Sequence, residues 1–373
     1  MAKRVGGDKW LFFTTLLLVV VGLAMVFSAS AVVAQEKFHS AYTFVGKQAG
    51  WALAGLVFML LLSWIDYARY KSSRVIYALL CATSILLALV FFFPKSNNAH
   101  RWIRVHGYSF EPSELAKLVL VLFLAWFLSA RLDKMSDWKS TLPRAIFIPL
   151  VFIVLIVLQP DLGTALVLAG VTVIMLFLAG MNWKFMAVAV GVTLPPLAGL
   201  LFWVPFRNQR IQVFKRFLLN PNCDLKDLKE VGAAGYHTCQ SLIAVGSGGV
   251  AGLGYMDGQQ KLFFLPEAHT DFIFANIAEE WGFIGAICLL ALFAFFCYRG
   301  LRIAFRSQDS FARLAAFGIT MTIILQAFFN ISVVIALLPT KGLPLPLISS
   351  GGTSLFFTLA SIGILLNISR KVD

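Results

Sequence analysis

Residues 10–34 read WLFFTTLLLVVVGLAMVFSASAVVA, a long run without a single charged side chain. A helix that crosses the hydrocarbon core of a bilayer needs about 20 such residues. The small residues Ser28, Ala29 and Ser30 resemble a signal-peptide cleavage site, but the apolar core of a signal peptide spans only about 7–15 residues. We therefore interpret this run as an uncleaved first transmembrane helix.

The rest of the chain repeats this pattern. Hydrophobic residues make up 59% of the sequence and charged residues only 13%, against about 25% charged in soluble domains. The apolar runs predict spans at 10–34, 48–65, 75–93, 113–130, 145–158, 162–181, 185–204, 272–297, 314–338 and 353–368. Pro149 interrupts the fifth run, and without that span the orientation of everything after it would invert. The sequence predicts an all-α polytopic membrane protein of about ten transmembrane helices, with residues 1–373 as one membrane domain.

The basic residues orient these spans. With ten spans, more than half of the 31 lysines and arginines fall in short loops on the side of the two termini, and such loops are cytoplasmic. Both termini are therefore expected in the cytoplasm. The net charge of +13 is then largely an orientation signal, and no nucleic-acid motif accompanies it, so we expect a membrane partner and no nucleic acid. Residues 205–271 form a large extracytoplasmic loop between the seventh and eighth helices.

That outer loop has three notable features. Residues 207–219 predict a basic amphipathic helix in the membrane interface, either an anchor on lipid headgroups or a cradle for an anionic lipid-linked substrate. The glycine-dense stretch 246–254 suits either a phosphate nest or close packing of a re-entrant segment. Cys223 and Cys239 lie in an oxidising compartment, where they either pair as a disulfide or remain two thiols. The cysteines and histidines show no zinc-site spacing, and no metal site is predicted.

Charged residues within or at the ends of membrane spans are costly and by default mark function. Glu114 and Lys117 share one helix face, either as a mutual ion pair or as part of a polar site. Asp271 lies where the outer loop re-enters the membrane, so it either caps the eighth helix or acts as a catalytic base. Glu279, about 80° around a regular helix and roughly 12 Å deeper, is expected to support the same cavity. Lys341 is either a snorkelling lysine or a cation of this site.

Several motifs together resemble the SEDS family of FtsW, RodA and SpoVE proteins. They are GLAMVFSAS (22–30), RWI (101–103), PSELAK (112–117), QPDLGT (159–164), residues 241–249, PEAHTDFIF (266–274) and LPTKG (338–342). They follow one another in the family's order over nearly the whole chain. The Ser-Ala-Ser end of the first span looks more like the division-type FtsW members than RodA.

The resemblance implies a peptidoglycan glycosyltransferase that polymerises lipid II into glycan strands at the outer face of the bacterial cytoplasmic membrane, at the division septum. It implies lipid II and undecaprenyl-pyrophosphate-linked glycan as substrates, and a class B penicillin-binding protein and other division proteins as partners. Asp271 matches the family's essential aspartate. The remaining candidates are the pyrophosphate-binding residues Arg101, Glu114, Lys117, Arg216 and Lys341, and the supporting residues Glu279, Ser349 and Gly351. The family also suggests help from a divalent cation, Mg²⁺ or Mn²⁺, although no site for one is evident.

Three other functions fit parts of the pattern. A lipid II flippase would suit ten helices with intramembrane charges, but the sequence has no inverted repeat and its polar residues gather on one side. A RodA-type polymerase of cell elongation would share every motif. A purely structural scaffold would leave Asp271 and Lys117 without a purpose.

Overall fold

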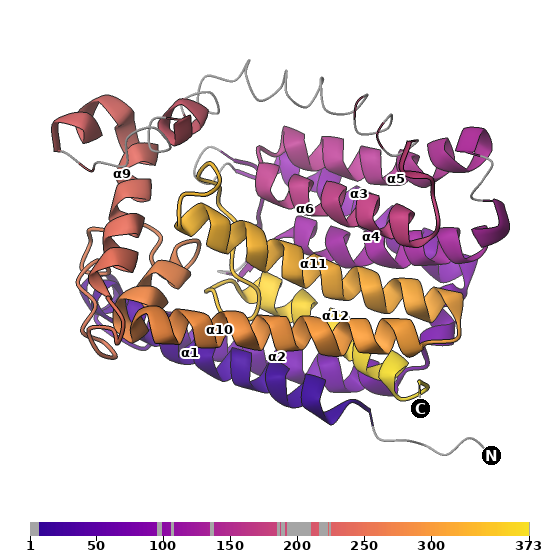
Figure 1. Ribbon diagram of the computed structural model, residues 1–373, viewed down its shortest axis with the longest axis horizontal. Coiled ribbons are helices and arrows are strands. Elements are labelled where there is room, and N and C mark those ends of the chain that lie inside the picture. Colours follow the sequence, from indigo (N-terminus) through magenta and orange to yellow (C-terminus); the bar gives the residue numbers. More distant parts are fainter. Residues whose placement is uncertain are drawn as a thin grey trace.

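The computed structural model describes residues 7–94, 99–105, 108–134, 138–184, 187, 191, 210–215, 223 and 225–372. These residues form a bundle of long helices that run side by side, with one short hairpin (Figure 1). The elements are α1 (Lys9–Phe38), α2 (Thr43–Trp64), η1 (Tyr67–Lys71), α3 (Ser73–Leu89), η2 (Val90–Phe92), β1 (Ile103–Val105), β2 (Tyr108–Phe110), α4 (Pro112–Ser129), η3 (Leu132–Lys134), α5 (Trp138–Leu158), α6 (Leu162–Leu178), α9 (Leu225–Ser247), α10 (Ile273–Arg306), α11 (Ser310–Val334) and α12 (Gly352–Ser369).

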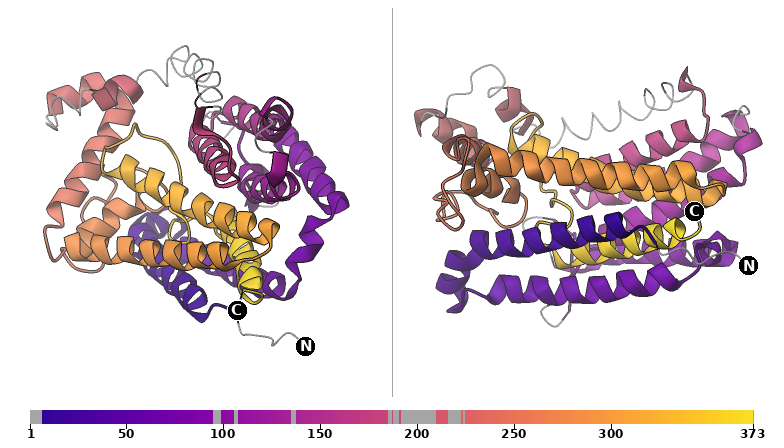
Figure 2. Two further views of the ribbon diagram at one scale, coloured as in Figure 1. Left: turned by 45° about the vertical axis from the view of Figure 1, so that its right-hand side comes forward. Right: turned by 60° about the horizontal axis from the view of Figure 1, so that its bottom comes forward.

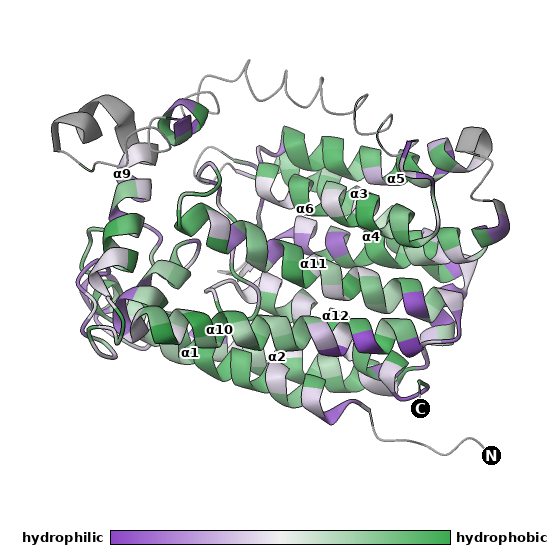
Figure 3. Ribbon diagram, viewed as in Figure 1, coloured by the Kyte–Doolittle hydropathy of each residue, from purple (hydrophilic) through white to green (hydrophobic). Residues whose placement is uncertain are grey.

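The all-α polytopic membrane fold is confirmed. Within the described ranges, eight helices are long and apolar enough to cross a membrane, and α6 is a shorter apolar helix. These nine helices correspond to nine of the ten predicted spans. The remaining one, 185–204, lies almost wholly outside the described residues. Figure 3 shows apolar residues along the helices and polar ones toward their ends and in the loops.

Two helices differ in extent from the predicted spans, and a third was not predicted. The fifth helix is longer than expected, because α5 begins at Trp138 and contains both Pro143 and Pro149; packed neighbours let membrane helices tolerate proline. The eighth, α10, continues to Arg306 and breaks at Gly282. The outer loop contains α9, a helix that the sequence did not predict, lying across the left-hand end of the bundle in Figure 1.

Helix α11 lies at the centre. It contacts α4, α6, α10 and α12, while Figure 2 shows α3 to α6 on one side of the bundle and α1, α2 and α10 on the other. A central helix of a membrane bundle can place polar side chains where lipid does not reach them. Gln326 and Asn330 of α11, each 2% exposed, are such residues, and both reach the outer end of the bundle.

The start of α1 and the end of α12 lie at the same end of the bundle (Figure 1). The Asp8 backbone N–H donates to Ser369 Oγ at 2.9 Å, and Asp8 Oδ2 pairs with Arg299 at 2.5 Å. Chain ends that meet require an even number of membrane crossings, as ten spans provide. With the termini in the cytoplasm, as the basic residues of the short loops predict, the opposite end of the bundle, where α10 begins, is the outer end.

Candidate active site at the outer end of the bundle

Asp271 lies two residues before the start of α10, and its carboxylate does not cap that helix. The N-cap residue is Phe272, and no side chain caps it. Instead the Asp271 backbone is held from the side, because Asn330 Nδ2 donates to the Asp271 carbonyl at 2.8 Å and to the Leu343 carbonyl at 2.7 Å. Of the two roles open for Asp271, the cap is excluded and the carboxylate remains available for chemistry.

Gly342 faces this carboxylate. A Cβ added at Gly342 would lie 2.9 Å from Asp271 Oδ2 and 3.8 Å from Arg101 Nη1. Any side chain at position 342 would push the Asp271 carboxylate out of its present position, and glycine has none. The segment with Lys341 and Gly342, predicted to belong to the site, is therefore brought against Asp271.

Three cations converge around this point. Arg101 Nη1 lies 3.9 Å from Asp161 Oδ1, and the same guanidinium donates to the Pro160 carbonyl. Arg210 Nη1 donates to the Thr340 carbonyl at 3.0 Å. Burial, with repulsion from Arg210, lowers the pKa of Lys341 to about 8. Arg101 and Lys341 were predicted from sequence, whereas Arg210 was seen only as one of several basic residues in a predicted interfacial helix.

The surroundings change the acidity of Asp271. Burial and the nearby Glu267 carboxylate raise the pKa of Asp271 to about 7, while Arg101 and Arg210 act in the opposite direction. Its side chain nevertheless remains partly exposed. A carboxylate whose pKa lies near the working pH, at an accessible position, suits a general base.

Glu114 and Lys117 occupy a different environment. Lys117 Nζ lies 2.7 Å from Glu114 Oε2 and also donates to Gln326 Oε1, and the two residues are only 5% and 2% exposed. Gln326 in turn donates to the Pro344 carbonyl at 2.9 Å. The two side chains also line a pocket together with Gln326, and their direct binding of pyrophosphate stays a prediction. The ion pair braces the Lys341 segment through Gln326.

Ser349 and Gly351 support the same segment. Ser349 Oγ donates to the Thr270 carbonyl at 2.5 Å and accepts from the Leu345 N–H at 2.8 Å. The Gly351 N–H donates to Gln48 Oε1 at 3.1 Å. Ser349 thereby fixes the residue before Asp271.

The glycine-dense stretch is interlocked with the break in α10. The Phe283 N–H donates to the Gly249 carbonyl at 2.9 Å, and the Gly254 N–H donates to the Glu280 carbonyl at 3.0 Å. Gly282 has φ 65°, and a Cβ on it would lie 2.2 Å from the Gly252 nitrogen. Of the two roles open for this stretch, close packing of a re-entrant segment fits, because its backbone groups bind α10.

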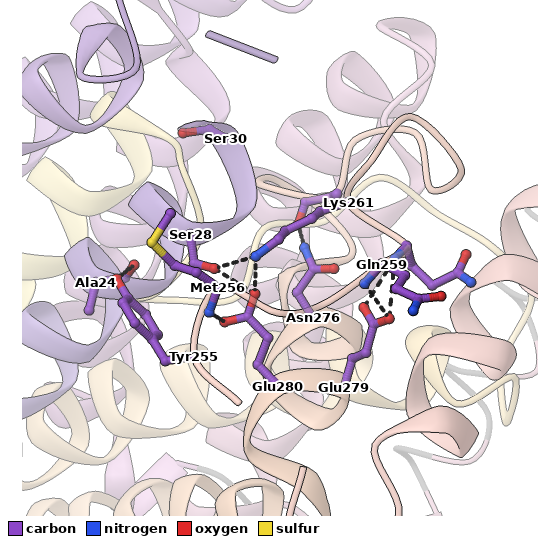
Figure 4. A network of polar contacts seen from close by, with 12 residues as sticks. Ala24, Ser28, Ser30, Tyr255, Met256, Gln259, Lys261, Asn276, Glu279 and Glu280 are labelled. Carbon is purple, nitrogen blue, oxygen red and sulfur yellow. Dashed lines mark hydrogen bonds and ion pairs between the residues drawn. The ribbon is translucent and has the colours of Figure 1, made fainter. Parts of the chain in front are cut away.

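Glu279, predicted to support the Asp271 cavity, binds the outer loop through its carboxylate. Its Oε1 accepts from the backbone N–H groups of Gln259 at 2.8 Å and Gln260 at 3.2 Å (Figure 4). The carboxylate thus holds the loop that leads to Asp271.

Two further predictions concern the outer loop. Cys223 and Cys239 are joined in a disulfide with 5.7 Å between their Cα atoms. Nearby in α9, the His237 ring lies edge-on to the Phe272 ring, with 5.9 Å between the ring centroids. Within the predicted interfacial helix, residues 210–215 are helical, and Arg216 lies outside the described residues.

The residues present do not fit a metal site. In the part of the chain that the structure describes, no three His, Cys, Asp or Glu side chains converge to hold an ion. Around Asp271 and Asp161 the neighbouring groups are the guanidinium groups of Arg101 and Arg210. These guanidinium groups already balance the negative charge of the two carboxylates.

Comparisons with known proteins agree over the whole chain. The family model for FtsW, RodA and SpoVE, described as cell cycle protein, matches residues 8–373. The chain is 40% identical to the probable peptidoglycan glycosyltransferase FtsW of Geobacter sp. (strain M18), over 100% of this chain and 99% of that protein. A solved chain from a peptidoglycan synthase complex has a TM-score of 0.78 at 29% identity and covers 98% of both chains. The crystal structure of Thermus thermophilus rod shape determining protein RodA has a TM-score of 0.70 at 29% identity, over 99% of this chain and 98% of that one. The chain belongs to the cell cycle protein family of FtsW, RodA and SpoVE.

Proposed function

We propose that this multi-pass membrane protein is a peptidoglycan glycosyltransferase that polymerises lipid II at the outer face of the bacterial cytoplasmic membrane. One observation carries the proposal: an accessible carboxylate with a pKa of about 7 lies among three cations at the outer end of the bundle. The relatives that bear the name peptidoglycan glycosyltransferase support the same activity.

The reaction needs one base and stabilisation of one leaving group. Asp271 takes the proton from the acceptor sugar hydroxyl of lipid II, and the resulting oxygen forms a bond to the anomeric carbon of the growing chain. The bond from that carbon to the pyrophosphate oxygen breaks, and its electron pair leaves with undecaprenyl pyrophosphate. Arg101, Arg210 and Lys341 stabilise the negative charge that develops on the pyrophosphate.

The partner and the cellular site belong to the same proposal. We expect a class B penicillin-binding protein to crosslink the strands made here, since one solved chain of similar fold comes from a peptidoglycan synthase complex. Relatives named FtsW favour septal wall synthesis with other division proteins over the elongation role of RodA.

Polymerisation and lipid transport are distinguishable in one experiment. The purified full chain, with its transpeptidase partner, is given labelled lipid II in liposomes, and both glycan ladders and movement of lipid II between leaflets are recorded. We expect glycan ladders from the wild-type protein, and a loss of these ladders when Asp271 is replaced. Movement of lipid II between leaflets without any polymer would establish the flippase instead.

The pH dependence follows from the state of Asp271. Below pH about 7 its carboxyl is protonated and accepts no proton, so kcat/KM is expected to rise with pH through about 7. It is expected to fall again above about 8, where Lys341 loses the charge that stabilises the pyrophosphate. Glu267→Gln removes a nearby negative charge that raises this pKa, so the rising limb is expected to move to lower pH. A pH profile of both proteins tests this, and a limb that stays in place after the substitution would contradict the assignment of Asp271 as the titrating base.

A further inference from the structure

Lys261 is a buried cation that the proposed reaction does not use. It lies in the loop between α9 and α10, and only 4% of it is exposed. Its Nζ donates to Glu280 Oε1 at 2.6 Å and to Ser28 Oγ at 2.9 Å, and Ser28 Oγ donates to the same Glu280 oxygen at 2.5 Å (Figure 4). Three elements meet here: α1 through Ser28, α10 through Glu280, and the loop through Lys261.

The same stretch of α10 also binds the loop backbone. Glu280 Oε2 accepts from the Met256 N–H at 3.1 Å, next to the bonds that Glu279 accepts from Gln259 and Gln260. These carboxylates therefore fix the loop at the start of its path to Asp271.

The path from there to Asp271 is continuously bonded. The Leu265 N–H donates to the Gln260 carbonyl at 2.8 Å, and the Phe272 N–H donates to the Glu267 carbonyl at 3.3 Å. Asn276 Nδ2, in the first turn of α10, donates to the Ala268 carbonyl at 2.9 Å. The loop is thus bound to α10 at both ends. Helix α1 joins it through Ser28 and through the Tyr255 hydroxyl, which donates to the Ala24 carbonyl.

The gain in folding stability alone does not explain why Lys261 and Glu280 form a buried ion pair. A buried ion pair is often no more stabilising than a well-packed apolar pair, because both charges must be desolvated. What such a pair supplies is a fixed direction for each partner. We propose that Lys261, Glu280 and Ser28 form a positioning triad that sets the place of the Asp271 carboxylate, an inference that rests on the proposed function.

The test replaces the ion pair without leaving a buried charge. Lys261→Met together with Glu280→Gln keeps the chain lengths and leaves an amide oxygen to accept from the Met256 N–H. We expect the double variant to keep its thermal stability, whereas kcat for lipid II polymerisation falls about 10-fold or more, since a 1 Å misplacement can cost about 10²-fold. KM is expected to stay within roughly twofold, because the cations that bind substrate are untouched.

A matched control exists at the inner end of the same two helices. Asp8, the N-cap of α1, pairs with Arg299 of α10. Asp8→Asn with Arg299→Met removes this ion pair and keeps an oxygen for the cap. The control is expected to retain the wild-type kcat.

Hydrogen exchange adds a readout that does not require activity. The backbone amides of 262–272 are expected to exchange faster in the triad variant and at the wild-type rate in the control. Ser28→Ala, which leaves the ion pair in place, is expected to show the same changes to a smaller extent and serves if the double variant fails to fold.

Three results would overturn the proposal. They are wild-type kcat in a folded triad variant, an equal loss of kcat in the inner-end control, and unchanged exchange of 262–272. Absence of polymer from the wild type would overturn the proposed function, and the exchange data would still decide whether the triad positions the loop.

Discussion

Asp271→Asn is expected to lower the rate of lipid II polymerisation by about 10²–10⁴-fold, the usual contribution of a general base. Asparagine has nearly the same size, but its amide does not accept the proton of the acceptor hydroxyl. The measurement is the initial rate of glycan formation by the purified chain with its partner, followed on a gel.

The loss should not come from unfolding. Asp271 does not cap α10, and Asn330 holds its backbone rather than its carboxylate. Thermal unfolding of the variant is therefore expected to match the wild type. Asp257→Asn, which changes an exposed carboxylate in the same loop, should keep the wild-type rate. Undiminished polymerisation by Asp271→Asn would show that another group is the base.

Gly342→Ala is expected to reduce the rate by at least about 10-fold without unfolding the protein. The added methyl group would meet Asp271 Oδ2 at 2.9 Å, which is closer than such atoms approach. The carboxylate lies at the end of a flexible side chain, so it can rotate away at little cost in folding free energy. It would then no longer point at the substrate.

A second glycine provides the control. Gly50, near the outer end of α2, has no atom within 4 Å of an added Cβ, so Gly50→Ala should leave the rate unchanged. Equal rates for Gly342→Ala and the wild type would mean that the Asp271 carboxylate is not held where we describe it.

Hydropathy alone predicted most of the helices, because a bilayer leaves a long uncharged run such as 10–34 no other regular structure. It did not predict α9. The first half of α9 contains Lys226, Asp227, Lys229 and Glu230 within a loop that is outside the membrane, so no apolar run marks it. The three-dimensional structure reveals α9, which packs against α10 and α11.

The positions of the polar residues were harder to predict. Spacing on an ideal helix placed Glu279 toward the Asp271 cavity, but did not predict that its carboxylate accepts from the backbone N–H groups of Gln259 and Gln260. The bond from Lys117 to Gln326 was not predicted, because Gln326 comes from a distant part of the chain. Arg210 was one cation among several, and only the fold singles it out by its bond to Thr340. Local pattern predicts where a charge lies along the chain, whereas its partner depends on tertiary packing.

The central claim is that glycosyl transfer takes place beside Asp271. Its most direct test is to count the undecaprenyl pyrophosphate released and the disaccharide units incorporated when the purified chain and its transpeptidase partner act on lipid II. We predict one pyrophosphate carrier released for each unit added, with both falling together in Asp271→Asn. Lipid II that remains intact with the wild-type protein, or release that continues undiminished in Asp271→Asn, would contradict the account.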